Sequence, residues 1–137
     1  MRGSTTSWSL PARRPPPAGT LGAVDPEAAD HDIELTVVTL GFDARAADDG
    51  AADRLLAVLA KYVVVSRGQP GCRNIDLCAS QTEPGRFLVI EKWETPAAQR
   101  QHFDSPEMVE MAEACRGLVA RRPTVDLLAG ISAHDLA

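Results

Sequence analysis

The sequence predicts an α+β protein of the ferredoxin-like class, with a four-stranded antiparallel sheet and helices on one face. Its patterns follow one another as strand, helix, strand, strand, helix, strand, which is the split βαβ order. About 100 residues carry these patterns, a usual size for one domain. The third strand is apolar on both faces, so each face needs a cover.

Residues 1–31 differ in composition from residues 32–137, which we predict to form the single domain. They hold five of the ten prolines and show no apolar periodicity. Such a segment buries too little apolar surface to offset its chain entropy, so we predict a disordered tail. Its Arg-Pro run at 12–17 is typical either of a ligand for a proline-binding module or of an extension without function.

The first two elements are a strand and an amphipathic helix. Residues 33–42 (IELTVVTLGF) are β-branched and apolar, which favours a strand. Asp48 or Asp49 is expected to cap the helix that runs on to Ser66. Its core face repeats at steps of three and four, through Ala52, Leu55, Leu59, Tyr62, Val63 and Ser66. Gly68 is expected to take the left-handed C-terminal cap, and Pro70 prevents continuation.

Two strands follow, and we expect them to form a hairpin. Residues 72–80 and 86–93 flank a turn at 82–85 (TEPG). In the second of these strands, side chains alternate between the two faces of the sheet. One face receives Phe87, Val89, Glu91 and Trp93, and the other receives Leu88, Ile90 and Lys92. The helices of the same chain can cover one face only. We therefore predict that a second copy covers the other, giving a homodimer.

Two helix starts and a last strand complete the pattern. Thr95-Pro96 and Ser105-Pro106 each place a hydroxyl before a proline, which predicts helices over 96–103 and 106–120. Pro123 ends the second helix, and residues 124–131 are expected to form the fourth strand.

Composition excludes several classes of function. The formal net charge is −5, which argues against a protein that holds nucleic acid or an anionic membrane surface. No apolar run approaches the ~20 residues of a membrane helix, and no signal peptide is evident. Three irregularly spaced cysteines predict reduced thiols in a cytoplasmic protein and disfavour a zinc site.

Short motifs across residues 33–131 add a family signal. They are Pro70-Gly71-Cys72, Glu91-Lys92-Trp93-Glu94-Thr95, His102 and Ser105-Pro106. Together they resemble the antibiotic biosynthesis monooxygenase family, and IEKWETPAAQRQHFDSPEM is especially similar to its bacterial quinol monooxygenases. The resemblance implies a dimeric α+β barrel, in which the bare sheet faces meet and each subunit holds a pocket between sheet and helices.

The resemblance also implies a reaction. The best-known members of this family oxidise phenolic or hydroquinone polyketides to quinones with O2 and use no metal, flavin or haem. The protein then has to promote proton removal, hold the anion and exclude water. On this basis we expect a cofactor-independent monooxygenase that acts on a hydroquinone-like or polycyclic phenolic small molecule.

Five residues are candidates for the site. His102 matches the family's histidine after the Glu-x-Trp strand and is the candidate base, because imidazole titrates near neutrality. Trp93 offers a flat wall for an aromatic substrate, although core packing is the commoner role. Three others are expected to orient groups in the pocket, namely Glu91, Asn74 and Tyr62. Glu91 has an alternative role, which is to bond the backbone N–H groups at the start of the next helix. Asn74 and Asp76 have the alternative of being solvent-exposed strand residues without a role in the site.

Haem degradation, a further activity in this family, is not expected. The positions that match its asparagine, tryptophan and histidine hold Thr39, His102 and Ala112. Without a histidine to ligate iron, haem binding of that type is disfavoured. Two other functions stay open for the same fold. One is a non-catalytic dimer that binds a small molecule or acts in stress, and the other is an isomerase of a small hydroxyketone.

Overall fold

The computed structural model describes residues 8, 35–46 and 50–132, which contain all the predicted elements. In chain order they are β1 (Thr36–Asp43), α2 (Ala51–Ser66), β2 (Cys72–Ala79), β3 (Arg86–Trp93), α3 (Pro96–Phe103), α4 (Pro106–Ala114) and β4 (Thr124–Ala129). The order is the predicted one.

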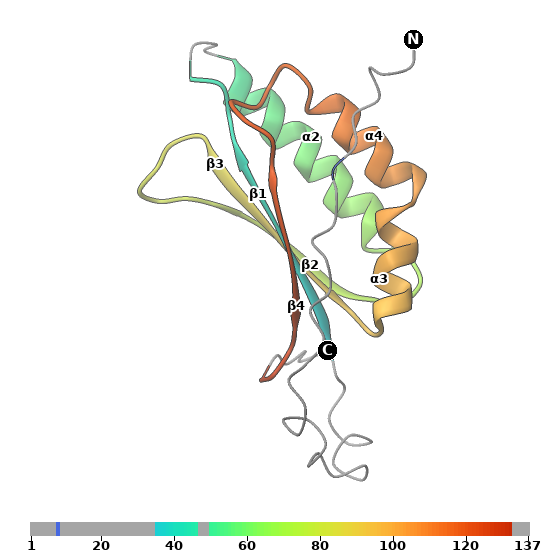
Figure 1. The fold of residues 1–137 in the computed structure, drawn as a ribbon. Coiled ribbons are helices and arrows are strands. Elements are labelled where there is room, and N and C mark those ends of the chain that lie inside the picture. The colour runs from blue at the N-terminus through green and yellow to red at the C-terminus, as the bar shows by residue number, and fades with distance from the viewer. Residues whose placement is uncertain (1–7, 9–34, 47–49, 133–137) are drawn as a thin grey trace, which may run out of the picture.

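The four strands form one sheet in the order β2-β3-β1-β4, and every neighbouring pair is antiparallel. Figure 1 shows the helices on one face of this sheet, with α2 and α4 side by side. The predicted fold class is therefore confirmed. The crossover that places β1 between β3 and β4 is what the split βαβ order requires.

The two faces of the sheet differ in cover. The helix-facing side is buried, and in β3 it presents Phe87, Val89, Glu91 and Trp93, as alternation predicted. The other side keeps large apolar groups accessible: Leu88 is 38% exposed and Leu128 is 42% exposed. The hydrophobic core thus lies between sheet and helices, and the second face has no cover within the described part of the chain.

Both predicted helix starts after β3 are confirmed. The hydroxyl of Thr95 accepts a hydrogen bond from the backbone N–H of Ala98 at 3.0 Å. The hydroxyl of Ser105 accepts one from Met108 at 3.3 Å. Each cap satisfies a backbone donor that the helix itself leaves free, so the two short helices begin at defined residues.

The predicted end of α4 is wrong, because the helix stops at Ala114 instead of continuing to residue 120. Gly117 has a φ of 80°, which turns the chain out of the helix. The segment then pairs with the end of β1: Arg45 donates to the carbonyl of Leu118 at 2.9 Å, and Ala120 to that of Asp43 at 2.7 Å. Sheet hydrogen bonds replace helical ones there.

The glycine at the end of α2 is also not the predicted one. Gly68 does not have a positive φ, and Arg67 caps the helix in a right-handed conformation. Gly71 adopts the left-handed conformation instead, with a φ of 83°, immediately before β2. The predicted caps Asp48 and Asp49 lie outside the described residues. Gly50 occupies the cap position, without a side-chain hydrogen bond.

Candidate functional site

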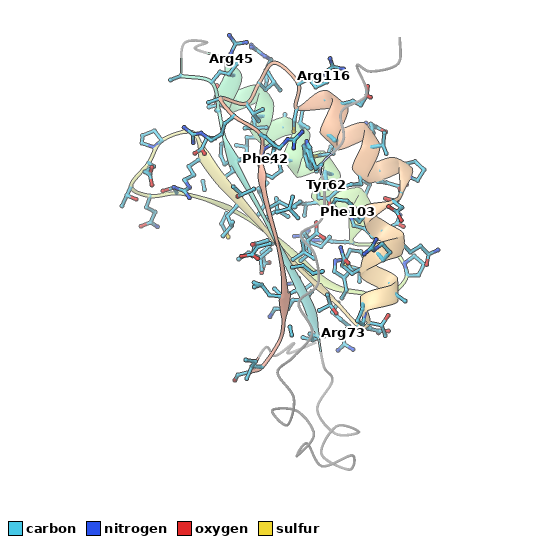
Figure 2. The ribbon with its side chains drawn as sticks, viewed as in Figure 1. Phe42, Arg45, Tyr62, Arg73, Phe103 and Arg116 are labelled. Atoms are coloured by element: carbon cyan, nitrogen blue, oxygen red, sulfur yellow. The ribbon has the colours of Figure 1, made fainter. Side chains whose placement is uncertain are left out.

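Four of the predicted site residues meet between the sheet and the helices. Tyr62 comes from the core face of α2, Glu91 and Trp93 from the covered face of β3, and His102 from α3. All four are buried, and His102 is 3% exposed. Figure 2 shows Tyr62 on the sheet side of the helix layer, above Phe103. We call these four residues the buried tetrad.

Hydrogen bonds and stacking join the tetrad. The Tyr62 hydroxyl donates to the Glu91 carboxylate, which also accepts from Trp93 Nε1 at 3.0 Å. The Tyr62 oxygen lies 2.8 Å from His102 Nε2. The indole of Trp93 stacks on the imidazole, with 4.6 Å between ring centroids and 26° between planes. The position of the imidazole is therefore fixed by one hydrogen bond and one aromatic face.

The protons of this network can be assigned by counting donors. When Glu91 is ionised, the phenol gives its one proton to the carboxylate, so its oxygen accepts from His102 Nε2–H. The imidazole is then the tautomer with a bare Nδ1. Nδ1 is buried and has no hydrogen-bond partner among the described residues. A lone pair in that position is a proton acceptor without a donor, which is unusual for a buried polar atom.

Burial determines the charge of each member. Desolvation lowers the pKa of His102 to about 4, although the carboxylate of Glu107 acts in the opposite direction. The pKa of Glu91 is raised by desolvation, partly offset by the hydrogen bonds from Tyr62 and Trp93. Desolvation and the charge of Glu91 raise the pKa of Tyr62 well above its usual value. At neutral pH the imidazole and the phenol are therefore uncharged.

Ser66 lies beside the tetrad, and the site analysis from sequence did not include it. It stands one helical turn after Tyr62 on the same face of α2, fully buried. Its Oγ has no hydrogen-bond partner among the described residues. The available signal was a serine at a core position of an otherwise apolar helix face.

Asn74 is not brought to the tetrad. A β-bulge between Cys72 and Asn74 shifts the register, so Cys72 pairs with Trp93 but Asn74 pairs with Lys92. This places Asn74 on the uncovered face, where its amide donates to the carboxylate of Asp76 at 3.0 Å. Without the bulge, alternation would have turned Asn74 to the side of Trp93.

The sequence suggested Trp93 as an aromatic wall for a substrate, and the structure places it among the tetrad side chains. Its indole is fully buried, and one face lies on the imidazole of His102. Its N–H is bound by Glu91. Trp93 thus contacts both the imidazole and the carboxylate. The Glu91 carboxylate bonds the side chains of Tyr62 and Trp93, which differs from the alternative of bonding the backbone of the next helix.

A groove reaches the tetrad from the helix layer. It has a volume of about 420 Å³ and is lined by α2 and α4, with Tyr62 and Met111 among its residues. Lys61 and Glu110 form an exposed ion pair of 2.7 Å at this groove. The volume falls within the range of small-molecule pockets, ~300–1,000 Å³. His102 is not among the lining residues, so Tyr62 is the tetrad member that this groove reaches.

The described residues offer no donor set for a metal ion. No group of three histidine, cysteine or carboxylate side chains converges within them. No disulfide joins Cys72, Cys78 or Cys115, which differ in burial. Thr39 pairs with Ile90 and lies on the uncovered face, away from the tetrad. In the described part of the chain, no helix has the length and apolarity that crossing a bilayer requires.

The family model described as "Antibiotic biosynthesis monooxygenase" matches residues 44–114. This range contains all four tetrad residues. A curated relative, an uncharacterized protein of Synechocystis sp., is 30% identical over 69 residues, which are 50% of this chain and 47% of the relative. The chain therefore spans about half the length of that relative.

Solved structures share the fold. Rv0793 of Mycobacterium tuberculosis is 26% identical, with a TM-score of 0.62, covering 69% of this chain and 92% of that one. A structure named as an antibiotic biosynthesis monooxygenase is 26% identical, with a TM-score of 0.60, covering 69% and 95%. PA3566 of Pseudomonas aeruginosa is 25% identical, with a TM-score of 0.61, covering 71% and 93%.

Proposed function

Because the chain belongs to the antibiotic biosynthesis monooxygenase family, we propose that it is a monooxygenase that needs no metal or organic cofactor. Its substrate is a hydroquinone-like or polycyclic phenolic small molecule, and its oxidant is O2. The observation that carries this proposal is the buried imidazole of His102, whose Nδ1 has no hydrogen-bond partner among the described residues and whose Nε2 is linked through Tyr62 to the carboxyl group of Glu91.

The tetrad supplies a route for a proton. A phenolic O–H that reaches His102 Nδ1 gives up its proton there, while Nε2–H passes to the oxygen of Tyr62 and the Tyr62 proton passes to Glu91. The net change is one proton from substrate to Glu91 and one negative charge from Glu91 to substrate. The His102 imidazole and the Tyr62 side chain are uncharged before and after the transfer. This suits a buried site, where forming an additional charge is costly.

The raised pKa of Glu91 makes it a better final acceptor than the imidazole. Desolvation favours the protonated carboxyl group, whereas it lowers the pKa of His102 to about 4. His102 and Tyr62 therefore act as carriers, and Glu91 acts as the base. Trp93 positions both ends of the route, because it donates to Glu91 and stacks on His102.

The anion then reacts with oxygen. A phenolate transfers an electron to O2, and the resulting radical pair combines at a ring carbon to a peroxide anion. The proton held by Glu91 returns to this anion, which becomes a hydroperoxide, and Glu91 is again a carboxylate. Loss of water from that carbon leaves a carbonyl, so a phenol with a free ring C–H and one O2 give a quinone and one H2O. One oxygen atom enters the product, the other leaves in water, and the ring supplies all the electrons.

Homodimer formation and a cytoplasmic location belong to the same proposal. The uncovered sheet face presents apolar side chains that one copy cannot bury, among them Leu88 and Leu128. A second copy of this face offers a matching surface, as in isologous dimers. Three cysteines without a disulfide suit a reducing compartment.

A non-catalytic binding protein is the second candidate. The observation that favours it is the close packing on the imidazole, with Trp93 on one face and Tyr62 at Nε2. In such a protein the tetrad would fix the core and would move no proton. An isomerase of a hydroxyketone would use the same proton route but would consume no oxygen.

Oxygen uptake separates these functions. We expect a panel of quinols and anthrones, followed with an oxygen electrode, to include a substrate. His102→Ala should lower the rate by about tenfold or more, because it removes the first acceptor. Gln101→Ala is the matched control, since Gln101 is exposed on the same helix. An equal rate in His102→Ala would eliminate the proton route, and substrate binding without uptake would favour the binding protein.

A further inference from the structure

Trp8 is part of the hydrophobic core, although it lies far from the domain in sequence. It is 8% exposed and belongs to the same core cluster as Tyr62, Trp93 and Met108. It is the only residue before Leu35 that the structure describes. By sequence it belongs to the predicted tail, 1–31, whose other residues lie outside the described part.

The indole of Trp8 packs edge-on against Phe42. Their ring centroids are 5.8 Å apart, and the planes meet at 63°. Aromatic pairs favour this arrangement, because the positive edge of one ring meets the negative face of the other. Phe42 is buried on the helix-facing side of β1 and pairs in register with Phe87 of β3. The sheet thus presents aromatic groups where the indole lies.

We propose that the space beside Phe42 is a binding site for a planar aromatic ring, and that Trp8 is the occupant that the chain itself provides. We call this space the Phe42 site. A free bicyclic aromatic molecule and Trp8 would then compete for it. The proposal concerns binding only and does not depend on the oxygenase reaction.

The Phe42 site lies in the same layer as the tetrad. Phe42 stands four residues from Val38, which pairs with Glu91, and both face the helices. At ~3.3 Å per residue, the two positions are roughly 13 Å apart along the strand. A ring bound beside Phe42 is thus held on the covered face of the sheet, and Trp8 affects what can enter that layer.

The connection explains why competition is measurable. Residues 9–34, 26 in all, join Trp8 to the domain. Because Trp8 is covalently part of the chain, it competes intramolecularly, and its effective concentration does not depend on the protein concentration. A free ring must exceed this internal competitor. Removal of the indole should therefore increase the apparent affinity for the free ring.

Calorimetric titration with quinoline, a bicyclic aromatic molecule without the phenolic O–H that the proposed reaction requires, tests this in the full chain. We expect Trp8→Ala to bind quinoline at least tenfold more tightly than the wild type, at one site per chain. Trp8→Phe keeps an internal ring and should stay within about threefold of the wild type. Val64→Ala, on the exposed side of α2, is the control for general loosening. Equal affinity in Trp8→Ala and wild type would overturn the proposal.

A second measurement decides the matter if Trp8→Ala does not fold. The chain has two tryptophans, so wild-type protein labelled with 5-fluorotryptophan gives two ¹⁹F resonances, which Trp8→Phe assigns. On addition of quinoline, the Trp8 resonance should move to the position of an exposed indole while that of Trp93 stays. A Trp8 resonance that does not move at saturating quinoline would refute competition.

Discussion

At the scale of single residues, Tyr62 joins the two halves of the site. Its hydroxyl is the contact between the Glu91 carboxylate and the imidazole of His102. A phenol can do this because its oxygen donates and accepts at once. The hydrogen bond from Tyr62 also opposes the rise in the pKa of Glu91. Loss of this one oxygen should therefore interrupt the proton route between His102 and Glu91, so that Glu91 no longer acts as the base.

Tyr62→Phe removes the hydroxyl that links Glu91 to His102 and changes the shape of the side chain little. We expect kcat to fall by about tenfold or more, because the proton on His102 Nε2 loses its acceptor. The ring still fills its place, so KM should change little. The residual kcat should also no longer depend on the protonation of Glu91, because the carboxyl group is no longer linked to the imidazole. An unchanged kcat would show that Tyr62 carries no proton.

His102 should make the stability of the fold sensitive to acid. The imidazole takes up a proton near pH 6.5 in the unfolded chain, but only at about 4 in the folded one. Between these values the unfolded state binds more protons, so stability falls as pH falls. Integrated over the window, this is ~3 kcal/mol of unfolding free energy.

Urea unfolding at pH 7, 5.5 and 4 measures this contribution. The wild type should lose about 3 kcal/mol relative to His102→Gln between pH 7 and 4, since the amide does not titrate. Glu91 acts in the opposite direction, because its raised pKa favours the folded state as pH falls, but it is present in both proteins. If the unfolding free energies of the two proteins changed with pH in parallel, the lowered pKa of His102 would be contradicted.

At the scale of elements, α3 carries His102 and is short. Eight residues do not form a stable helix alone, so its ends and neighbours have to position it. The cap by Thr95 and the proline after it define the start. Gly71 supports that start from the other side, since its carbonyl accepts from Glu94 at 2.8 Å. A Cβ there would lie 2.5 Å from the Cβ of Ala98.

Gly71→Ala should therefore destabilise the fold more than a glycine change elsewhere. The positive φ costs about 1 kcal/mol for alanine, and the clash with Ala98 adds about 2. Gly117→Ala is the matched control: its φ is 80°, but nothing lies within 4 Å of its Cβ, so it should cost only about 1 kcal/mol. Thermal unfolding of both checks the difference, and equal losses would exclude the clash.

At the scale of the whole molecule, the open question is the cover of the second sheet face. Ile90 lies near the middle of that face, paired with Thr39 on one side and Asp76 on the other. If two copies meet there, a lysine at Ile90 would lose the hydration of its ammonium group, and the neighbouring Asp76 carboxylate would not fully offset that cost of several kcal/mol. One substitution should then separate the copies.

Light scattering at micromolar concentration measures the outcome. The wild type should have the mass of two chains and Ile90→Lys that of one. Val64→Lys is the control, because Val64 is 66% exposed on the helix side and should leave the dimer intact. A monomeric wild type, or an Ile90→Lys variant that remains dimeric, would remove this face as the interface.

The sequence by itself determined the fold class and most of the tetrad. Alternation in β3 was enough to place Glu91 and Trp93 on one face, and the period of α2 turned Tyr62 inward. The caps at Thr95 and Ser105 defined two helix starts. These features are local, because backbone periodicity and the first turn of a helix depend on neighbouring residues.

Only the tertiary structure decided which of these residues touch. The hydrogen bonds among Tyr62, Glu91 and His102 join three elements, and their geometry depends on how α2 and α3 pack on β3. The bulge that turns Asn74 away, and the pairing that ends α4 early, each follow from contacts with a distant strand. The position of Trp8 depends on a ring 34 residues away. Periodicity carries no information about such partners, because packing selects them after the elements have formed.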